Sequence, residues 1–148
     1  MASCRQNLLL VAEDSDEDFE VLSHIMQDLA VPNPVHRCED GGEVLEFLRR
    51  IQHQPEVSAA NPTVILLDLN LPGIDGRQVL TTIKQDKRLQ TIPVVVLTTS
   101  MNPNDVEFCY REGANGYLVK PMEMEDLETT IRAFIRFWLE TNLSPRNP

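Results

Sequence analysis

Three short segments of the sequence are almost wholly apolar, and they constrain the fold more than any other feature. They are Leu8–Val11, Thr63–Leu67 and Ile92–Leu97, and the last is rich in β-branched residues. Strands without an alternating polar face are typical of a parallel sheet that helices cover on both sides. We therefore expect an α/β fold rather than an all-β or an all-helical one.

Helical patterns separate these segments along the chain. Residues spaced for one helical face follow Ser15, and Pro32 ends that pattern. Further helices are predicted over Gly42–His53, around Val79–Ile83, over Asn102–Glu112 and over Glu123–Thr141, with two more strands at Val35–Cys38 and Asn115–Val119. The alternation predicts five β–α units in one domain spanning residues 1–148, with a core over about 6–141 and a flexible tail at 142–148. Right-handed crossovers make this a doubly wound five-stranded parallel sheet with five helices.

Charge and cysteine usage narrow the class of protein. The net charge of −10 argues against nucleic acid or an anionic membrane as a direct partner, because phosphate binding needs a basic surface. Cys4, Cys38 and Cys109 are far apart and odd in number, which indicates neither a disulfide framework nor a zinc site. The N-terminus has only a five-residue apolar run, too short for a signal peptide. We expect a reduced, cytoplasmic protein.

Polar residues collect where the predicted strands end. The first strand runs into Glu13 and Asp14, the third into Asp68, the fourth into Thr98 and the fifth into Lys120. Ligands of doubly wound sheets bind at this edge. Three clustered carboxylates need a cation, and hard oxygen ligands suit Mg²⁺. A lysine and a threonine suit a transferred phosphoryl group, and Asp68 would be the nucleophile that forms an aspartyl phosphate.

Each of these residues has a structural explanation of its own. Glu13 and Asp14 could cap the next helix, and Asp68 the next turn. Thr98 suits a strand, and Lys120 could be a solvated surface charge. It is their joint position at successive strand ends that favours a functional site. His24, His36 and His53 are scattered and are expected to have surface or packing roles. Met122 and Met124 are expected to fill the core.

Four stretches resemble the response-regulator receiver domain of two-component signalling: LLLVAED, VILLDLNLPGIDG, IPVVVLTTS and GANGYLVKP. The resemblance covers roughly residues 6–141. LLDLNLPGIDGRQVL, PVVVLTTS and the late FWL are more narrowly similar to the small receivers paired with cyanobacterial phytochromes. The resemblance implies a flavodoxin-like sheet with strand order 2-1-3-4-5.

The resemblance also implies roles for individual residues. Asp68 would accept phosphate from the phosphohistidine of a sensor histidine kinase, phytochrome-like in the narrower comparison. Asp14 would bind Mg²⁺ directly, Glu13 mainly through water, and Asn70 through its backbone carbonyl. The phosphate-binding and switch residues would be Thr98, Thr99, Tyr117 and Lys120. Thr98 would move toward the phosphoryl group, Tyr117 would change rotamer with it, and the bulk of Thr99 would restrict water. The protein would catalyse only its own phosphorylation and dephosphorylation, and would not otherwise be an enzyme.

Two other classes of protein are alternatives, and the intact set of Glu13, Asp14, Asp68, Thr98 and Lys120 argues against the second of them. A haloacid-dehalogenase phosphatase needs Asp-x-Asp on its first strand, whereas Asp68-Leu69-Asn70 follows the third strand here. A pseudo-receiver would act as a phosphorylation-independent interaction module.

After Val119 only 29 residues remain, so no output domain is expected and signals would pass through a partner that the sequence does not identify.

The last predicted helix carries a wide apolar stripe. Leu127, Ile131, Phe134 and Trp138 have the spacing of one buried face. Ile135, Phe137 and Leu139 widen it to about 200° at 100° per residue, more than a one-sided surface helix needs. The excess predicts a symmetric homodimer through Ile135, Phe137 and Leu139. The alternative is that neighbouring loops cover the stripe.

Overall fold

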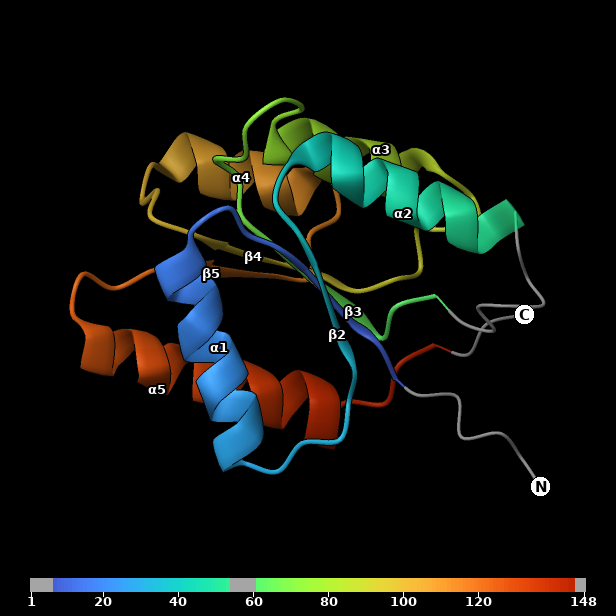
Figure 1. Cartoon of the computed structure of the whole chain (residues 1–148). Helices are drawn as coiled ribbons and strands as arrows, with labels where there is room; N and C mark the ends of the chain where they lie inside the picture. Colours follow the sequence, from blue (N-terminus) through green and yellow to red (C-terminus); the bar gives the residue numbers. More distant parts are fainter. Residues whose placement is uncertain (1–6, 54–60, 146–148) are drawn as a thin grey trace, which may run out of the picture.

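The computed structural model describes residues 7–53 and 61–145, and they form an alternating series of strands and helices (Figure 1). The elements are β1 (Leu9–Ala12), α1 (Asp16–Asp28), β2 (Val35–Cys38), α2 (Gly41–His53), β3 (Val64–Leu67), α3 (Gly76–Gln85), β4 (Val94–Thr98), α4 (Pro103–Arg111), β5 (Gly116–Val119), α5 (Met124–Ile135) and the π-helical segment η1 (Arg136–Thr141). None of the helices in these two ranges is long and apolar enough to cross a membrane.

All five strands are parallel and lie in the order β2-β1-β3-β4-β5. Helices α1 and α5 cover one face of the sheet, and α2, α3 and α4 cover the other (Figure 1). This arrangement confirms the predicted doubly wound fold and its strand order. Because β1 and β3 are neighbours at the centre, the residues that follow them meet at one edge of the sheet.

Alternation along the strands divides the core into two layers. In β1, Leu9 and Val11 pack on the α1/α5 side, whereas Leu10 and Ala12 pack on the opposite side. Every residue of β1, β3 and β4 is buried. The edge strands β2 and β5 are only partly buried. The strands that carry the central carboxylates are therefore held on both faces, which fixes the chain where it leaves the sheet.

The observed bounds differ from the predicted ones by a residue or two. Strand β4 begins two residues later than expected and includes Thr98, which is fully buried. Ser15 caps α1, because its Oγ accepts the Asp18 backbone N–H at 3.3 Å. The predicted tail is described only to Pro145, and within it the Ser144 hydroxyl donates to the Thr63 carbonyl at 3.2 Å.

The end of the last helix corrects the predicted dimer face. A π-helix has more residues per turn than the α-helix, so 100° per residue does not place Phe137 and Leu139 correctly. Ile135 is fully buried, Leu139 packs partly against the core, and only Phe137 is largely exposed, at 49%. Ile135 therefore cannot line a surface of this chain. The core assignment of Met122 and Met124 is also wrong, because both are exposed.

Candidate functional site

The site lies at the carboxyl edge of the sheet, and backbone hydrogen bonds fix the residues there. The Asp68 N–H donates to the Ala12 carbonyl at 3.0 Å, so the end of β3 is tied to the end of β1. The Lys120 N–H likewise donates to the Thr98 carbonyl at 2.7 Å. Gly76 lets α3 begin directly above this edge, since a Cβ there would lie 2.2 Å from the Asp68 carbonyl oxygen.

Three carboxylates converge at this edge as the sequence predicted. One ligand oxygen from each of Glu13, Asp14 and Asp68 lies within 4.8 Å of the others. Glu13 and Asp68 are 4% and 5% exposed, whereas Asp14 is exposed. An oxygen cluster that is open to water on one side fits a hydrated divalent cation such as Mg²⁺ or Mn²⁺. Burial of these charges without a counterion would be costly.

Lys120 supplies the positive charge among these carboxylates. Its Nζ lies 2.7 Å from Glu13 Oε1 and 2.9 Å from Asp68 Oδ2, and its side chain is only 8% exposed. Burial alone would lower the pKa of Lys120, but hydrogen bonds to Glu13 and Asp18 outweigh burial and raise it. Burial also raises the pKa of Glu13, against the opposing hydrogen bond from Lys120. The ammonium therefore stays charged and offsets part of the negative charge.

Asp18 belongs to this site, although the sequence indicated only a helix start. Its Oδ2 lies 2.9 Å from Lys120 Nζ, so the ammonium contacts three carboxylates. Asp18 is in the first turn of α1, and that turn begins beside the strand ends. The position of this turn next to the strand ends could have indicated that Asp18 belongs to the site. Acidic residues in a first helical turn are, however, common for electrostatic reasons alone.

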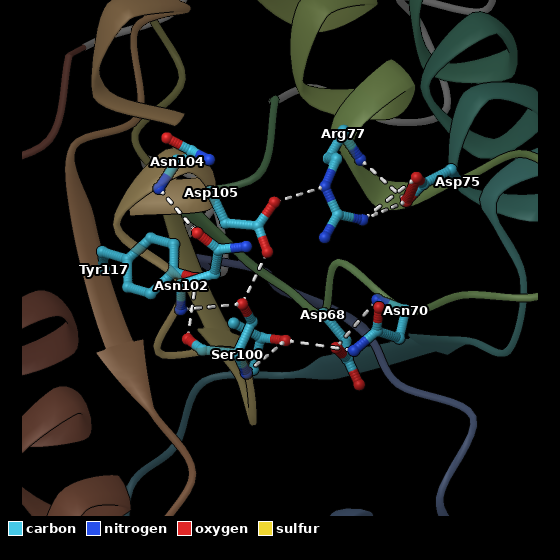
Figure 2. Close-up of polar contacts among 10 residues, drawn as sticks. Asp68, Asn70, Asp75, Arg77, Ser100, Asn102, Asn104, Asp105 and Tyr117 are labelled. Atoms are coloured by element: carbon cyan, nitrogen blue, oxygen red, sulfur yellow. Dashed lines mark hydrogen bonds and ion pairs between the residues drawn. The ribbon is translucent and has the colours of Figure 1, made fainter. Parts of the chain in front are cut away.

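Polar residues from the ends of β3 and β4 and from β5 form a second group, which Figure 2 shows beside Asp68. The Asn70 N–H donates to Asp68 Oδ1 at 3.1 Å, and its side-chain amide donates to Thr98 Oγ1 at 3.4 Å. The Tyr117 hydroxyl donates to the Ser100 carbonyl at 2.9 Å, while Thr99 is exposed. The structure thus links Asp68, Asn70 and Thr98 directly, and it links Tyr117 to the loop after β4.

The sequence matches the response regulator receiver domain family over residues 9–132, and the chain belongs to that family. It is 40% identical over 139 residues to response regulator Rcp1 of Synechocystis, covering 93% of this chain and 92% of Rcp1. It is 36% identical over 138 residues to the probable methanogenesis regulatory protein FilR2 of Methanothrix harundinacea, covering 93% of this chain and 87% of FilR2.

Solved structures agree with this assignment. The Mn²⁺-bound form of Rcp1 superposes with a TM-score of 0.84 at 38% identity, over 94% of this chain and 99% of that one. The phosphorylated cyanobacterial phytochrome response regulator RcpA gives the same TM-score at 36% identity, over 95% and 99% of the two chains. This chain is therefore a receiver of two-component signalling with close relatives among the phytochrome response regulators.

Proposed function

We propose that the chain is a phosphoacceptor switch in which Asp68 takes a phosphoryl group from a sensor histidine kinase. An Asp68 oxygen forms the new O–P bond while the P–N bond to the kinase histidine breaks, and the imidazole leaves neutral after taking up a proton. The observation that carries this proposal is the Lys120 ammonium, held 2.9 Å from Asp68 Oδ2 on a side chain that is only 8% exposed. It can neutralise charge on the transferred oxygens.

The acidic cluster fits the cation that this chemistry requires. Glu13, Asp14 and Asp68 would hold Mg²⁺ together with the Asn70 backbone carbonyl, and the ion would neutralise phosphoryl oxygens. The hydroxyl of Thr98 would donate to one of those oxygens, and Tyr117 would follow the resulting movement of the loop. The exposed Thr99 would restrict water near the phosphoryl group.

A phytochrome-like histidine kinase is the partner that the relatives support. RcpA, whose structure this chain matches over 95% of its length, is described as a cyanobacterial phytochrome response regulator. Phosphotransfer profiling of purified kinases tests this part of the proposal. A phytochrome kinase should phosphorylate this chain faster than unrelated kinases do, and equal rates would argue against the pairing.

We also infer that the chain signals as a homodimer through its last helix, α5 with η1, and through the α4/β5 face. Phe137 is 49% exposed and stacks edge-on against Trp138, with ring centroids 4.9 Å apart. Tyr110 of α4, in the helix layer on the other face of the sheet, is 52% exposed, and exposed aromatic side chains of this kind would favour self-association. Phe137→Glu should give a folded monomer by light scattering, with Arg49→Glu as the control, because Arg49 is an exposed residue of α2 outside the proposed face. A wild-type monomer at high micromolar concentration, with and without phosphate, would contradict this inference.

Intact mass after incubation with Mg²⁺ and acetyl phosphate tests the phosphoacceptor function. A lasting gain of one phosphoryl group, lost in Asp68→Asn, is the expected result. Steady hydrolysis of a phosphate monoester such as p-nitrophenyl phosphate would instead indicate a phosphatase. No addition with any donor would indicate a pseudo-receiver that works as an interaction module.

A further inference from the structure

A polar network centred on Ser100 connects helix α4 to the Thr98 hydroxyl. Figure 2 shows Ser100 between Asp105 and Tyr117. The Ser100 hydroxyl donates to Asp105 Oδ2 at 2.5 Å. Its backbone N–H donates to Thr98 Oγ1 at 3.5 Å, and its carbonyl accepts the Tyr117 hydroxyl at 2.9 Å. The position of Ser100 therefore affects both residues that respond to the phosphoryl group.

Asp105 is itself fixed from the side of α3. Arg77 Nε donates to Asp105 Oδ1 at 3.0 Å, so each Asp105 oxygen has a donor, one from Arg77 and one from Ser100. Arg77 also bonds both oxygens of Asp75, the N-cap of α3, at 3.1 Å. Hydrogen bonds from Arg77 and then Ser100 keep the pKa of Asp105 below its usual value. The carboxylate is thus charged and held between α3 and the loop after β4.

The network also orients the hydroxyl of Thr98. Thr98 is fully buried, and its Oγ1 accepts from the Asn70 amide at 3.4 Å and from the Ser100 N–H at 3.5 Å. Two donors on the oxygen direct the hydroxyl proton away from Asn70 and Ser100. A donor whose hydroxyl is oriented before the charge arrives needs less reorganisation to stabilise that charge.

We propose that Asp105 is a positioning residue for the phosphoryl group: through Ser100 it holds the Thr98 hydroxyl ready to donate to an oxygen of phosphorylated Asp68. This inference rests on the proposed function and goes beyond it, because Asp105 is on α4 and acts through another residue. The hydrogen bond between Asp105 and Arg77 joins the first turns of α3 and α4, so both helices help to hold Ser100 in position.

Beryllofluoride, which mimics the phosphoryl group on an aspartate, is the probe, and its affinity is measured by titration in saturating Mg²⁺. Asp105→Ala should weaken its binding about three- to tenfold, the effect of losing one supported hydrogen bond. Ser100→Ala breaks the same bond from the other side and should give a similar loss if Asp105→Ala does not fold. Glu107→Gln is the control, because Glu107 lies exposed on α4 and pairs with Arg111.

The background of Thr98→Ala separates positioning from a general structural effect. In that background Asp105→Ala should have almost no further effect on beryllofluoride affinity, and Mg²⁺ affinity should stay within about twofold throughout. An equal loss in both backgrounds, or no loss in either, would overturn the inference alone. Failure of the unaltered protein to bind beryllofluoride would overturn the proposed function and, with it, this inference.

Discussion

Replacing Lys120 with methionine would remove an ammonium from the centre of the acidic site while keeping a long side chain there. The ammonium lies within 2.9 Å of oxygens from Glu13, Asp18 and Asp68. Glu13 and Asp68 are buried at this point, so the substitution would leave two buried carboxylates without their counterion. We expect a folded but clearly less stable protein in the absence of divalent cations.

The expected loss in the free energy of unfolding depends on how exposed the carboxylates around Lys120 are. Breaking a fully buried ion pair costs about 3–5 kcal/mol. The site is not fully dry, because Asp14 is exposed and the side chain of Asp18 is 23% exposed. We therefore expect Lys120→Met to lower the free energy of unfolding by about 2–3 kcal/mol in EDTA at pH 8. If Mg²⁺ binds with a Kd of about 1 mM, then about 10 mM Mg²⁺ would return roughly 1.4 kcal/mol.

The pH dependence gives the same prediction a second test. Burial raises the pKa of Glu13 to about 7, and Lys120 opposes that rise, so the pKa of Glu13 should be higher still in Lys120→Met. A carboxyl whose pKa is higher in the folded than in the unfolded state binds more protons when folded. The variant should therefore regain stability as the pH falls from above 7 toward the unfolded value of about 4.3.

Urea denaturation followed by circular dichroism, at pH 8 and pH 6 and with and without Mg²⁺, measures the loss of stability, the gain from Mg²⁺ and the pH dependence. Lys87→Met is the matched control, because Lys87 is exposed. A Lys120→Met protein that unfolds within about 0.5 kcal/mol of the wild type in EDTA at pH 8 would refute the argument, since that is the usual effect of a surface substitution.

Three further substitutions test the other parts of the site. Asp68→Ala should abolish phosphorylation while circular dichroism stays unchanged, since it removes one of several crowded carboxylates; phosphorylation at the wild-type rate would be incompatible with the assignment. Asp14→Ala should lose millimolar Mg²⁺ binding in calorimetry, and an unchanged affinity would exclude Asp14 as a ligand. Thr98→Ala should accept phosphate but change its affinity for a partner less than the wild type does, and a full wild-type change would argue against coupling through its hydroxyl.

The position of the site could be predicted because it depends on strand ends. Apolar runs show where a buried strand stops, and in a parallel sheet all such ends lie at the same edge. Glu13, Asp14, Asp68 and Lys120 were found in this way and do converge. The strand order could not be predicted in this way, because the hydrophobic pattern does not determine it. That prediction came from the resemblance to receiver domains.

The two carboxylates that the sequence did not place in the site are on helices, and their contacts are long-range. In the sequence, Asp18 is simply an acidic residue in the first turn of a helix, and Asp105 has the same kind of position in α4. Only the packed structure shows that one reaches Lys120 and the other reaches Ser100 and Arg77. The error at Ile135 had another cause: it lies in α5, ahead of the π-helical segment, and only the packed structure shows that the core cluster shared with α1 buries it.

The sheet order explains why the positively charged residue at the end of β5 has a side chain as long as that of lysine. Strand β4 lies between β5 and β3, so the Lys120 side chain has to cross the end of β4 to reach Asp68. Neighbouring strands are about 4.8 Å apart, and only a long side chain spans two such intervals to meet an aspartate. A flexible ammonium can also turn between acceptors, as its contacts with Glu13, Asp18 and Asp68 allow. When Asp68 forms its ester, the donor that faced its oxygen can turn to the phosphoryl group while the other two contacts hold the side chain in place.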